Sequence, residues 1–316
     1  MTTALAGQPS RSPWKRRIDQ LFIRLTQVFA VCAGVLLACM VLVMAWQSVP
    51  AFQRFGLSFI FRSAWNPVPG REDFGVFPML YGTLVSSLLA LLIAVPLGLG
   101  TAIFLSEDFI PPWSRLAISF LVELLAAIPS VVYGLWGIFV LIPLLQPVER
   151  WLHAHLGWIP LFGTEPVGLG MLPASLVLAM MVLPIFTAIA KDSLEALPPE
   201  LRQASVALGA TRWWTLFRVL MPAALPGIVG GAILALGRAL GETMAVTMLI
   251  GNANQLNVSL LAPANTIASL LANQFPEARG IHVSALMYAA LLLMLMTLLV
   301  NLLAEAIIAR LKATYE

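Results

Sequence analysis

Six long apolar segments constrain the fold of this chain more than any other feature of its sequence. Each is close to or longer than the ~20 residues that a helix needs to cross the ~30 Å hydrocarbon core of a bilayer. The segments therefore predict an all-α, polytopic membrane protein with six transmembrane helices. They run approximately over Phe22–Gln47, Phe77–Leu105, Ser114–Leu145, Met171–Ala190, Ala223–Ile250 and Val283–Ile308.

Composition indicates the same class of protein. The 316 residues are 60% hydrophobic and 10% charged, whereas soluble domains contain about 25% charged residues. The basic residues behind the net charge of +3 are dispersed and cluster beside the apolar segments, which argues against a nucleic-acid partner. The first segment is too long and too far from the N-terminus for a cleaved signal peptide. We expect a basic N-terminal segment over residues 1–21 and one membrane domain over residues 22–316.

The distribution of lysine and arginine predicts the orientation in the membrane. Cytoplasmic loops carry an excess of these residues. With the N-terminus inside, twelve of the 18 lie on the cytoplasmic side, five lie in outer loops and Arg238 lies within the membrane. Both termini are therefore expected in the cytoplasm.

The fifth segment places an arginine and a glutamate at membrane depth, Arg238 and Glu242. A charge at the centre of a spanning helix costs roughly 2.5–3.5 kcal/mol, so such residues usually face a partner, a counter-charge or a water-filled path. In a continuous helix, residues four apart share one face and can meet. The planar guanidinium group matches the oxygens of an oxyanion. The pair is a candidate site for anion passage, in which Glu242 holds Arg238 poised and repels an anion that lingers. The alternative is a purely structural pair between helices.

Three further residues are candidates for the pathway. Thr243 and Ser130 offer hydroxyl groups, although such groups commonly bond backbone carbonyls in membrane helices. Ser130 follows Pro129, which removes a backbone donor from the third segment and predicts a bend or a break. The same segment contains Glu123, which either pairs with an arginine of a partner subunit or is protonated. The bent helix either borders the pathway and moves during gating, or is bent only for packing.

The cytoplasmic loop over residues 191–222 predicts a docking site for a soluble partner. Pro198 and Pro199 suit a helix start and Gly209 suits a helix end, which predicts a short helix over residues 199–208, a glycine turn and a second helix. Such a helix pair beneath the membrane fits a groove on another protein. The sequence contains no Gly-x-x-x-x-Gly-Lys-Ser/Thr run, so another polypeptide must bind ATP for any ATP-driven process.

The same loop resembles the EAA loop of ABC-importer permeases. In that pattern, three residues separate Glu-Ala-Ala from a glycine, and nine more separate the glycine from an Ile-x-Leu-Pro run. The spacing in this sequence matches that pattern throughout. Gln203 and Ser205 replace the glutamate and the second alanine, while Val219 and Met221 replace the isoleucine and the leucine. Gln203 departs from the charge of the family's first position. The resemblance implies that the loop contacts a separate ATPase subunit through Gln203, Ala204, Ser205, Gly209 and Pro222.

Four stretches resemble the PstC-type permeases of phosphate ABC transporters. They lie at residues 81–97, 104–107, 126–134 and 226–246. The resemblance extends over nearly the whole chain from about residue 65 and implies the type I ABC importer permease fold in a bacterial inner membrane. It implies inorganic phosphate as substrate, with no catalytic residue, cofactor or metal in this chain. It also implies an assembly with a PstA-type permease subunit, a PstB-type ATPase dimer and an external PstS-type phosphate-binding protein.

Several alternatives remain open from the sequence. Within the ABC permeases, the chain is alternatively a PstA-type subunit or a permease for sulfate or molybdate. The run from Arg238 to Thr243 argues for phosphate, but the PstA type has a similar run. The continuation over residues 244–246 and the long first outer loop favour the PstC type. From other classes, the alternatives are an ATP-independent secondary transporter, a channel or a membrane enzyme. No obvious inverted repeat and no nucleophile–base set supports these classes.

Overall fold

The structure is a computed structural model that describes residues 13–107, 109 and 111–315. Its helical content confirms the all-α prediction, and six helical stretches of the described chain are long and apolar enough to cross a membrane. The α-helices are α1 (Pro13–Phe55), α2 (Ser58–Phe61), α3 (Phe77–Ser106), α4 (Pro112–Ala127), α5 (Ser130–Trp136), α6 (Ile142–Leu156), α7 (Met171–Glu195), α8 (Pro199–Ala207), α9 (Arg212–Thr215), α10 (Met221–Gly241), α11 (Met244–Leu249), α12 (Ile267–Gln274) and α13 (Ile281–Tyr315). Two π-helical turns, Gly137–Leu141 and Leu216–Leu220, two 3₁₀ turns, Pro160–Phe162 and Phe275–Glu277, and a hairpin of β1 (Trp65–Asn66) and β2 (Asp73–Phe74) complete the chain.

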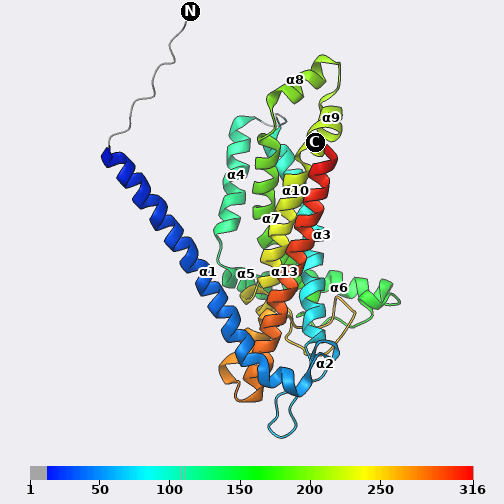
Figure 1. Ribbon diagram of the computed structural model, residues 1–316. Helices are drawn as coiled ribbons and strands as arrows, with labels where there is room; N and C mark the ends of the chain where they lie inside the picture. Colours follow the sequence, from blue (N-terminus) through cyan, green and yellow to red (C-terminus); the bar gives the residue numbers. More distant parts are fainter. Residues whose placement is uncertain (1–12, 108, 110, 316) are drawn as a thin grey trace, which may run out of the picture.

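Four helices, α3, α7, α10 and α13, run alongside one another and form the body of the protein (Figure 1). Helix α7 is central, because α3, α4 and α10 all pack against it. The core between these helices contains many small and aliphatic side chains, such as Ala90, Val182 and Ala235. Small residues at these contacts let helix backbones approach closely, which is how helices associate in a membrane.

Helices α8 and α9 lie at one end of the body, together with the described start of α1 and the end of α13 (Figure 1). We call this the α8–α9 end. The basic segment predicted over residues 1–21 lies partly outside the described residues, which begin at Pro13. Helix α1 leaves the body toward this end as a separate arm, and its apolar side chains are exposed there, as at Val35 and Leu36. A membrane environment or another membrane chain must cover such a surface.

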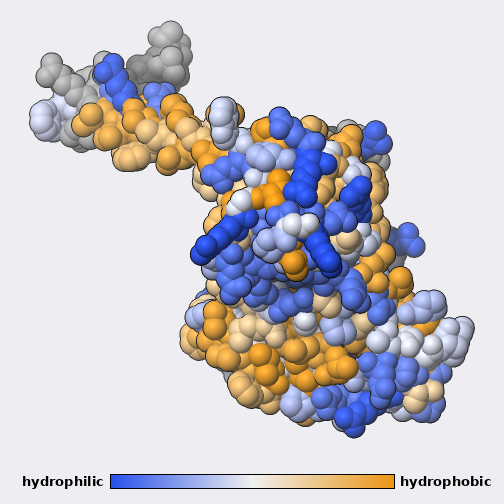
Figure 2. Space-filling model, turned by 90° about the horizontal axis from the view of Figure 1, so that it is seen from below, coloured by the Kyte–Doolittle hydropathy of each residue, from blue (hydrophilic) through white to orange (hydrophobic). Residues whose placement is uncertain are grey.

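The opposite end holds the connection between α1 and α3 and the segment between α11 and α13. Hydrophilic residues gather in the middle of this end, with apolar bands around them (Figure 2). Aromatic side chains join α2 and the hairpin to α13. Phe59 of α2 stacks on Tyr288 with ring centroids 4.6 Å apart, and Phe74 of β2 stacks on His282 with ring centroids 5.3 Å apart. Trp65 Nε1 donates a hydrogen bond of 2.7 Å to Gln274 Oε1 of α12. These contacts fix the outer connections onto the helical body.

Two of the six predicted spans are wrong as continuous helices. The predicted span Ser114–Leu145 is divided at Ile128 and Pro129, where the backbone is extended between α4 and α5. At 1.5 Å per residue the 16 residues of α4 reach only about 24 Å, so α4 alone does not cross the hydrocarbon core. The predicted span Ala223–Ile250 is divided at Glu242 and Thr243, between α10 and α11. Sequence hydropathy did not reveal these interruptions, because the residues around them are apolar.

A close contact in α3 gives a prediction about stability. A Cβ atom added to Gly82 would lie 2.1 Å from the backbone oxygen of Asn265, which cannot move without shifting the outer loop. We expect Gly82→Ala to lower the thermal stability of the purified protein strongly. Gly100→Ala in the same helix is the matched control, because nothing lies within 4 Å of its added Cβ. Alanine is favoured over glycine within a helix by roughly 0.5–1 kcal/mol, so this variant should be neutral or slightly more stable. Equal melting temperatures for both variants would show that the close contact between Gly82 and Asn265 does not limit stability.

Candidate functional site

The two divided spans meet inside the body of the protein. Helix α5, which follows the first break, packs against α11, which follows the second. Two glycines of this region permit the contact. A Cβ atom added to Gly134 would lie 2.5 Å from Met248 Sδ. A Cβ atom added to Gly137 would lie 2.8 Å from Leu249 Cδ1. Discontinuous membrane helices are typical of transporter binding sites, because irregular backbone is tolerated only within protein or along a water-filled cavity.

Tyr133 satisfies the backbone at the first break. Pro129 has no N–H group, so the carbonyl of Leu125 lacks the donor that a continuous helix would provide. The hydroxyl of Tyr133 donates a hydrogen bond of 2.9 Å to this carbonyl. The break predicted at Pro129 therefore has a structural compensation within the chain. The packing of α5 against α11 places the two breaks in one neighbourhood.

This hydrogen bond gives a second prediction. Tyr133→Phe leaves the Leu125 carbonyl with only the long 3.4 Å hydrogen bond from the Ile128 backbone N–H. The net contribution of one such hydrogen bond is about 0.5–1.5 kcal/mol. We expect a lower melting temperature for the purified variant. Tyr81→Phe is the control, because no hydrogen bond of the Tyr81 hydroxyl is found among the described residues. A Tyr133→Phe protein as stable as wild type would show that the break needs no compensation.

The second break separates Arg238 from Glu242. Helix α10 ends at Gly241, and Glu242 has an extended backbone with φ −66° and ψ 126°. The spacing of four residues therefore does not place the two side chains on one helical face. No ion pair joins them within the described chain. The expectation of a pair on one helix face is wrong, because it assumed a continuous helix.

Arg238 instead lines an open groove between α10 and α13. This inner groove has a volume of about 660 Å³ and lies on the α8–α9 side of the second break. Its lining includes Ile189, Gly230, Arg238, Asn301 and Glu305. The arginine side chain is exposed in the single chain, although its helix lies in a predicted span. Since an arginine facing lipid is costly, water or another chain must cover this groove.

Thr243 lines a second groove on the other side of the break. This outer groove has a volume of about 580 Å³ and also contains Gly241, Ala268 and Met287. The Thr243 hydroxyl donates a hydrogen bond of 3.1 Å to the carbonyl of Gly241. The hydroxyl therefore satisfies the backbone carbonyl at the end of α10, as threonine hydroxyls often do in membrane helices. Its oxygen can still accept a hydrogen bond. Between them, Arg238 and Thr243 link the break to grooves that open on either side of it.

Ser130 directly follows the first break, Glu123 lies within α4 more than one helical turn before it, and neither lines the inner groove or the outer groove. Glu123 is exposed on α4, a helix without buried residues, and no partner for its carboxylate is found among the described residues. Ser130 begins α5 and is half-buried. The structure does not bring either residue into contact with Arg238.

The loop over residues 191–222 forms the predicted pair of helices. Helix α8 ends close to the expected position, and Gly209 adopts a left-handed backbone with φ +83°. Gln203 and Ala204 are exposed, whereas Ser205 is buried and its hydroxyl lies 2.8 Å from that of Thr215. This hydrogen bond ties α8 to α9. The outer face of α8 is left free to contact another protein.

Pro222 lies where the second helix of the loop enters the body. It lacks an N–H group, so the carbonyl four residues earlier has no α-helical partner, and the π-helical turn Leu216–Leu220 precedes it. The helix nevertheless continues from Arg212 to Gly241. The loop is thereby connected directly to the helix that carries Arg238.

Comparison with known proteins identifies the family. Residues 94–313 match the family described as "Binding-protein-dependent transport system inner membrane component". The chain belongs to this family of permeases. It is 42% identical over 300 residues to the phosphate transport system permease protein PstC of Pasteurella multocida, covering 93% of each chain. It is also 42% identical to PstC of Mesorhizobium japonicum, covering 98% of this chain and 96% of the relative. The predicted resemblance to PstC-type permeases is confirmed.

The fold of the permease agrees with that of a solved importer. A bacterial ABC transporter involved in the import of the acidic polysaccharide alginate has a chain that aligns with a TM-score of 0.62 and 16% identity. The alignment covers 95% of this chain and 99% of that one. At this identity the similarity shows the fold alone, and it confirms the predicted type I importer architecture.

Sequence reasoning missed two sets of residues in this permease. Thr297, Asn301 and Glu305 line the inner groove with Arg238. Their spacing of four residues within the last apolar segment was the signal that could have placed them on one helix face. The second set joins α8 to the end of α3: Arg202 Nη2 lies 2.6 Å from Glu107 Oε1. No local pattern indicates that contact, because the residues are 95 positions apart.

Proposed function

We propose that this chain is the membrane-spanning subunit of an ATP-driven importer that translocates inorganic phosphate into the cytoplasm. The observation that carries the proposal is the exposed guanidinium group of Arg238, in an open groove beside the break between α10 and α11. Its planar donor fork matches two phosphate oxygens. The relatives named phosphate transport system permease protein support phosphate as the anion.

The pathway follows the two grooves past the second break. In this assignment, phosphate passes Thr243 in the outer groove and Arg238 in the inner groove. Glu242, half-buried between them, repels an anion that lingers and keeps binding weak enough for release. Ser130 and Glu123 border the first break, where Glu123 meets a partner subunit. Because the grooves are open in the single chain, the second permease subunit covers them.

The implied assembly contains four kinds of chain. A PstA-type permease subunit faces the grooves, a PstB-type ATPase dimer binds α8, and a PstS-type protein delivers phosphate from outside. Gln203, Ala204, Ser205, Gly209 and Pro222 belong to the ATPase contact and its connection to α10. The α8–α9 end then faces the cytoplasm with both termini, and the opposite end faces outward in the bacterial inner membrane. ATP hydrolysis belongs to the separate ATPase chain.

The test is uptake by the assembly reconstituted in lipid vesicles. We expect ATP-dependent accumulation of phosphate and none of sulfate at equal concentration. Uptake of sulfate or molybdate without uptake of phosphate would show that the substrate is another oxyanion. Uptake without ATP would assign a channel or a secondary transporter, and either result would contradict the proposal.

A further inference from the structure

We propose that α3 is a mechanical link that couples α8 to the outer loop over residues 251–266, with the Arg202–Glu107 ion pair as its inner joint. This role depends on one part of the proposed function, namely that an ATPase moves α8. It adds a second route from the ATPase to the candidate site, besides the continuous helix that leads from α9 to α10. Arg202 and Glu107 are positioning residues in this role.

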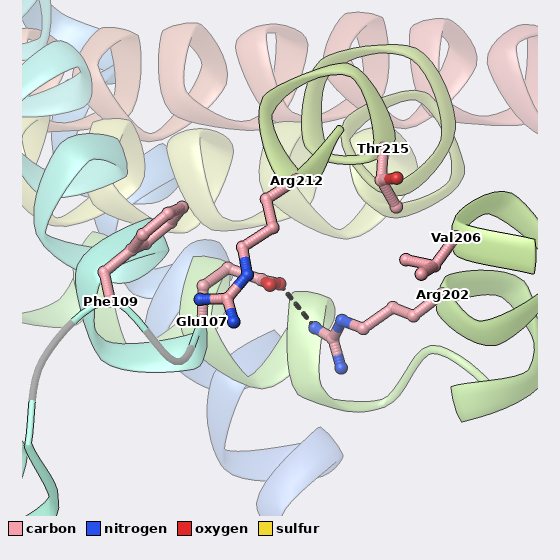
Figure 3. A pocket seen from close by; sticks show the side chains of 6 residues that line it. All are labelled: Glu107, Phe109, Arg202, Val206, Arg212 and Thr215. Carbon is pink, nitrogen blue, oxygen red and sulfur yellow. Dashed lines mark hydrogen bonds and ion pairs between the residues drawn. The ribbon is translucent and has the colours of Figure 1, made fainter. Parts of the chain in front are cut away.

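The inner joint connects α8 to the end of α3. Glu107 directly follows the last residue of α3, and its backbone N–H bonds the carbonyl of Ile103. Its carboxylate lies 2.6 Å from Arg202 of α8, and both side chains are partly shielded, with 17% and 33% of their surfaces exposed. Figure 3 shows this contact across a cavity of about 160 Å³, with the side chain of Arg212 reaching toward the same carboxylate. Arg202 thus faces the membrane body, while Gln203 and Ala204 beside it are exposed.

Two further contacts stiffen this joint. Phe109, just beyond α3, stacks on Trp213 of α9 with ring centroids 5.0 Å apart. Arg115 of α4 donates a hydrogen bond of 2.9 Å to the carbonyl of Glu107. Since Ser205 and Thr215 also bind each other, α8, α9 and the end of α3 are cross-linked as one unit. Displacement of α8 would therefore be transmitted to α3.

The outer joint lies about 36 Å away along the helix, from residue 107 to residue 83 at 1.5 Å per residue. There the backbone N–H of Ile267 donates a hydrogen bond of 3.1 Å to Thr83 Oγ1, a buried side chain. Gly82 contacts the carbonyl of Asn265 so closely that no side chain fits between them. Pro96 does not interrupt the helix, which packs along α7. A displacement at Glu107 therefore reaches the outer loop without passing a break.

The two routes reach the candidate site from opposite sides. The route through α9 and α10 ends at Arg238 and Gly241. The route through α3 ends at the loop that follows α11, where Ala264 N–H bonds the carbonyl of Ile250. Unequal movement of the two routes would change the irregular segment at Glu242 and Thr243, which lies between their ends. One input at α8 would then open one groove while closing the other.

The test uses the complete reconstituted complex and charge reversal at the inner joint. Uptake per ATP hydrolysed is measured for Arg202→Glu, Glu107→Arg and the double variant. We expect each single variant to lower this ratio roughly fivefold or more, in the range of typical coupling between sites. The double variant should restore it, because the ion pair is re-formed in reverse. Glu195→Lys is the control, because its partner Lys191 lies in the same helix and the pair joins no two elements.

A second readout does not depend on the transported solute. A spin label at Gln255→Cys in the outer loop, in a chain with Cys32→Ser and Cys39→Ser, reports movement of that loop on addition of ATP. The ATP-induced change should be lost in each single variant and recovered in the double variant. A label that responds to ATP in a complex that imports no phosphate would contradict the proposed function and support the role of α3.

Several results would overturn the role of α3. The first is that ATP does not move the label in the otherwise unchanged chain. The second is that a single variant keeps the same uptake per ATP hydrolysed, and the third is that the double variant does not recover this ratio. If a reversal prevents assembly, Arg202→Gln and Glu107→Gln replace it. Their losses should then not add in the double variant, because both remove the same contact. Additive losses would show that the two residues act separately.

Discussion

Arg238→Ala is expected to abolish phosphate uptake while the assembled complex remains intact. The guanidinium group lines the inner groove, and in the proposed pathway it supplies the donors that hold an oxyanion there. In enzymes, removing one donor to a developing oxyanion costs about 10²–10³ in kcat, and by analogy we expect uptake to fall about 100-fold or more. The measurement is initial uptake of labelled phosphate into vesicles, together with the subunit content of the purified complex.

Two further variants separate charge from shape at this position. Arg238→Lys keeps the positive charge and loses the planar fork, so it should retain only part of the uptake. Leu234→Ala changes the exposed apolar lining of the same groove and should transport at nearly the wild-type rate. Normal uptake by Arg238→Ala would remove Arg238 from the anion path. Equal loss in Leu234→Ala would indicate that the groove matters through its packing.

Gly209→Pro is expected to prevent ATPase docking or to uncouple ATP hydrolysis from uptake. Gly209 has a φ of +83°, and its N–H donates a hydrogen bond of 2.9 Å to the carbonyl of Val206. Proline fixes φ near −65° and has no N–H, so the turn between α8 and α9 cannot form as it stands. The measurements are co-purification of the ATPase chain, ATP hydrolysis and uptake in the same preparation.

Gly209→Asn is the matched control for this turn. Nothing lies within 4 Å of an added Cβ at this position, so a side chain meets no steric obstacle. Asparagine tolerates the left-handed backbone better than other residues with a side chain. This variant should dock the ATPase and couple hydrolysis to uptake. Coupled transport by Gly209→Pro would show that the turn is not needed for the connection between α8 and α10.

The coupling loop was predictable because its signals are local. Pro199 starts α8 and Gly209 ends it through backbone geometry that depends on few neighbours. The candidate anion site was predictable only in part. The sequence predicted Arg238 at membrane depth, but the assumption of a continuous helix placed Glu242 beside it. The break at Gly241 removes that relation, and no turn-forming residue other than this glycine marks it.

The sequence by itself determined the six apolar segments, the all-α class, the helix pair at residues 199–222 and the position of Arg238 in the fifth apolar segment. These follow from composition, hydrophobic length and backbone preference, which are properties of short stretches. Only the tertiary structure decided that the bend or break expected at Pro129 divides the third span, where the fifth span breaks, which grooves flank the second break, and that Arg202 meets Glu107. Those features depend on donors and charges brought together from distant segments. The Tyr133 hydroxyl at the Leu125 carbonyl is one example, because it adds a donor where the local chain offers only the long bond from the Ile128 N–H.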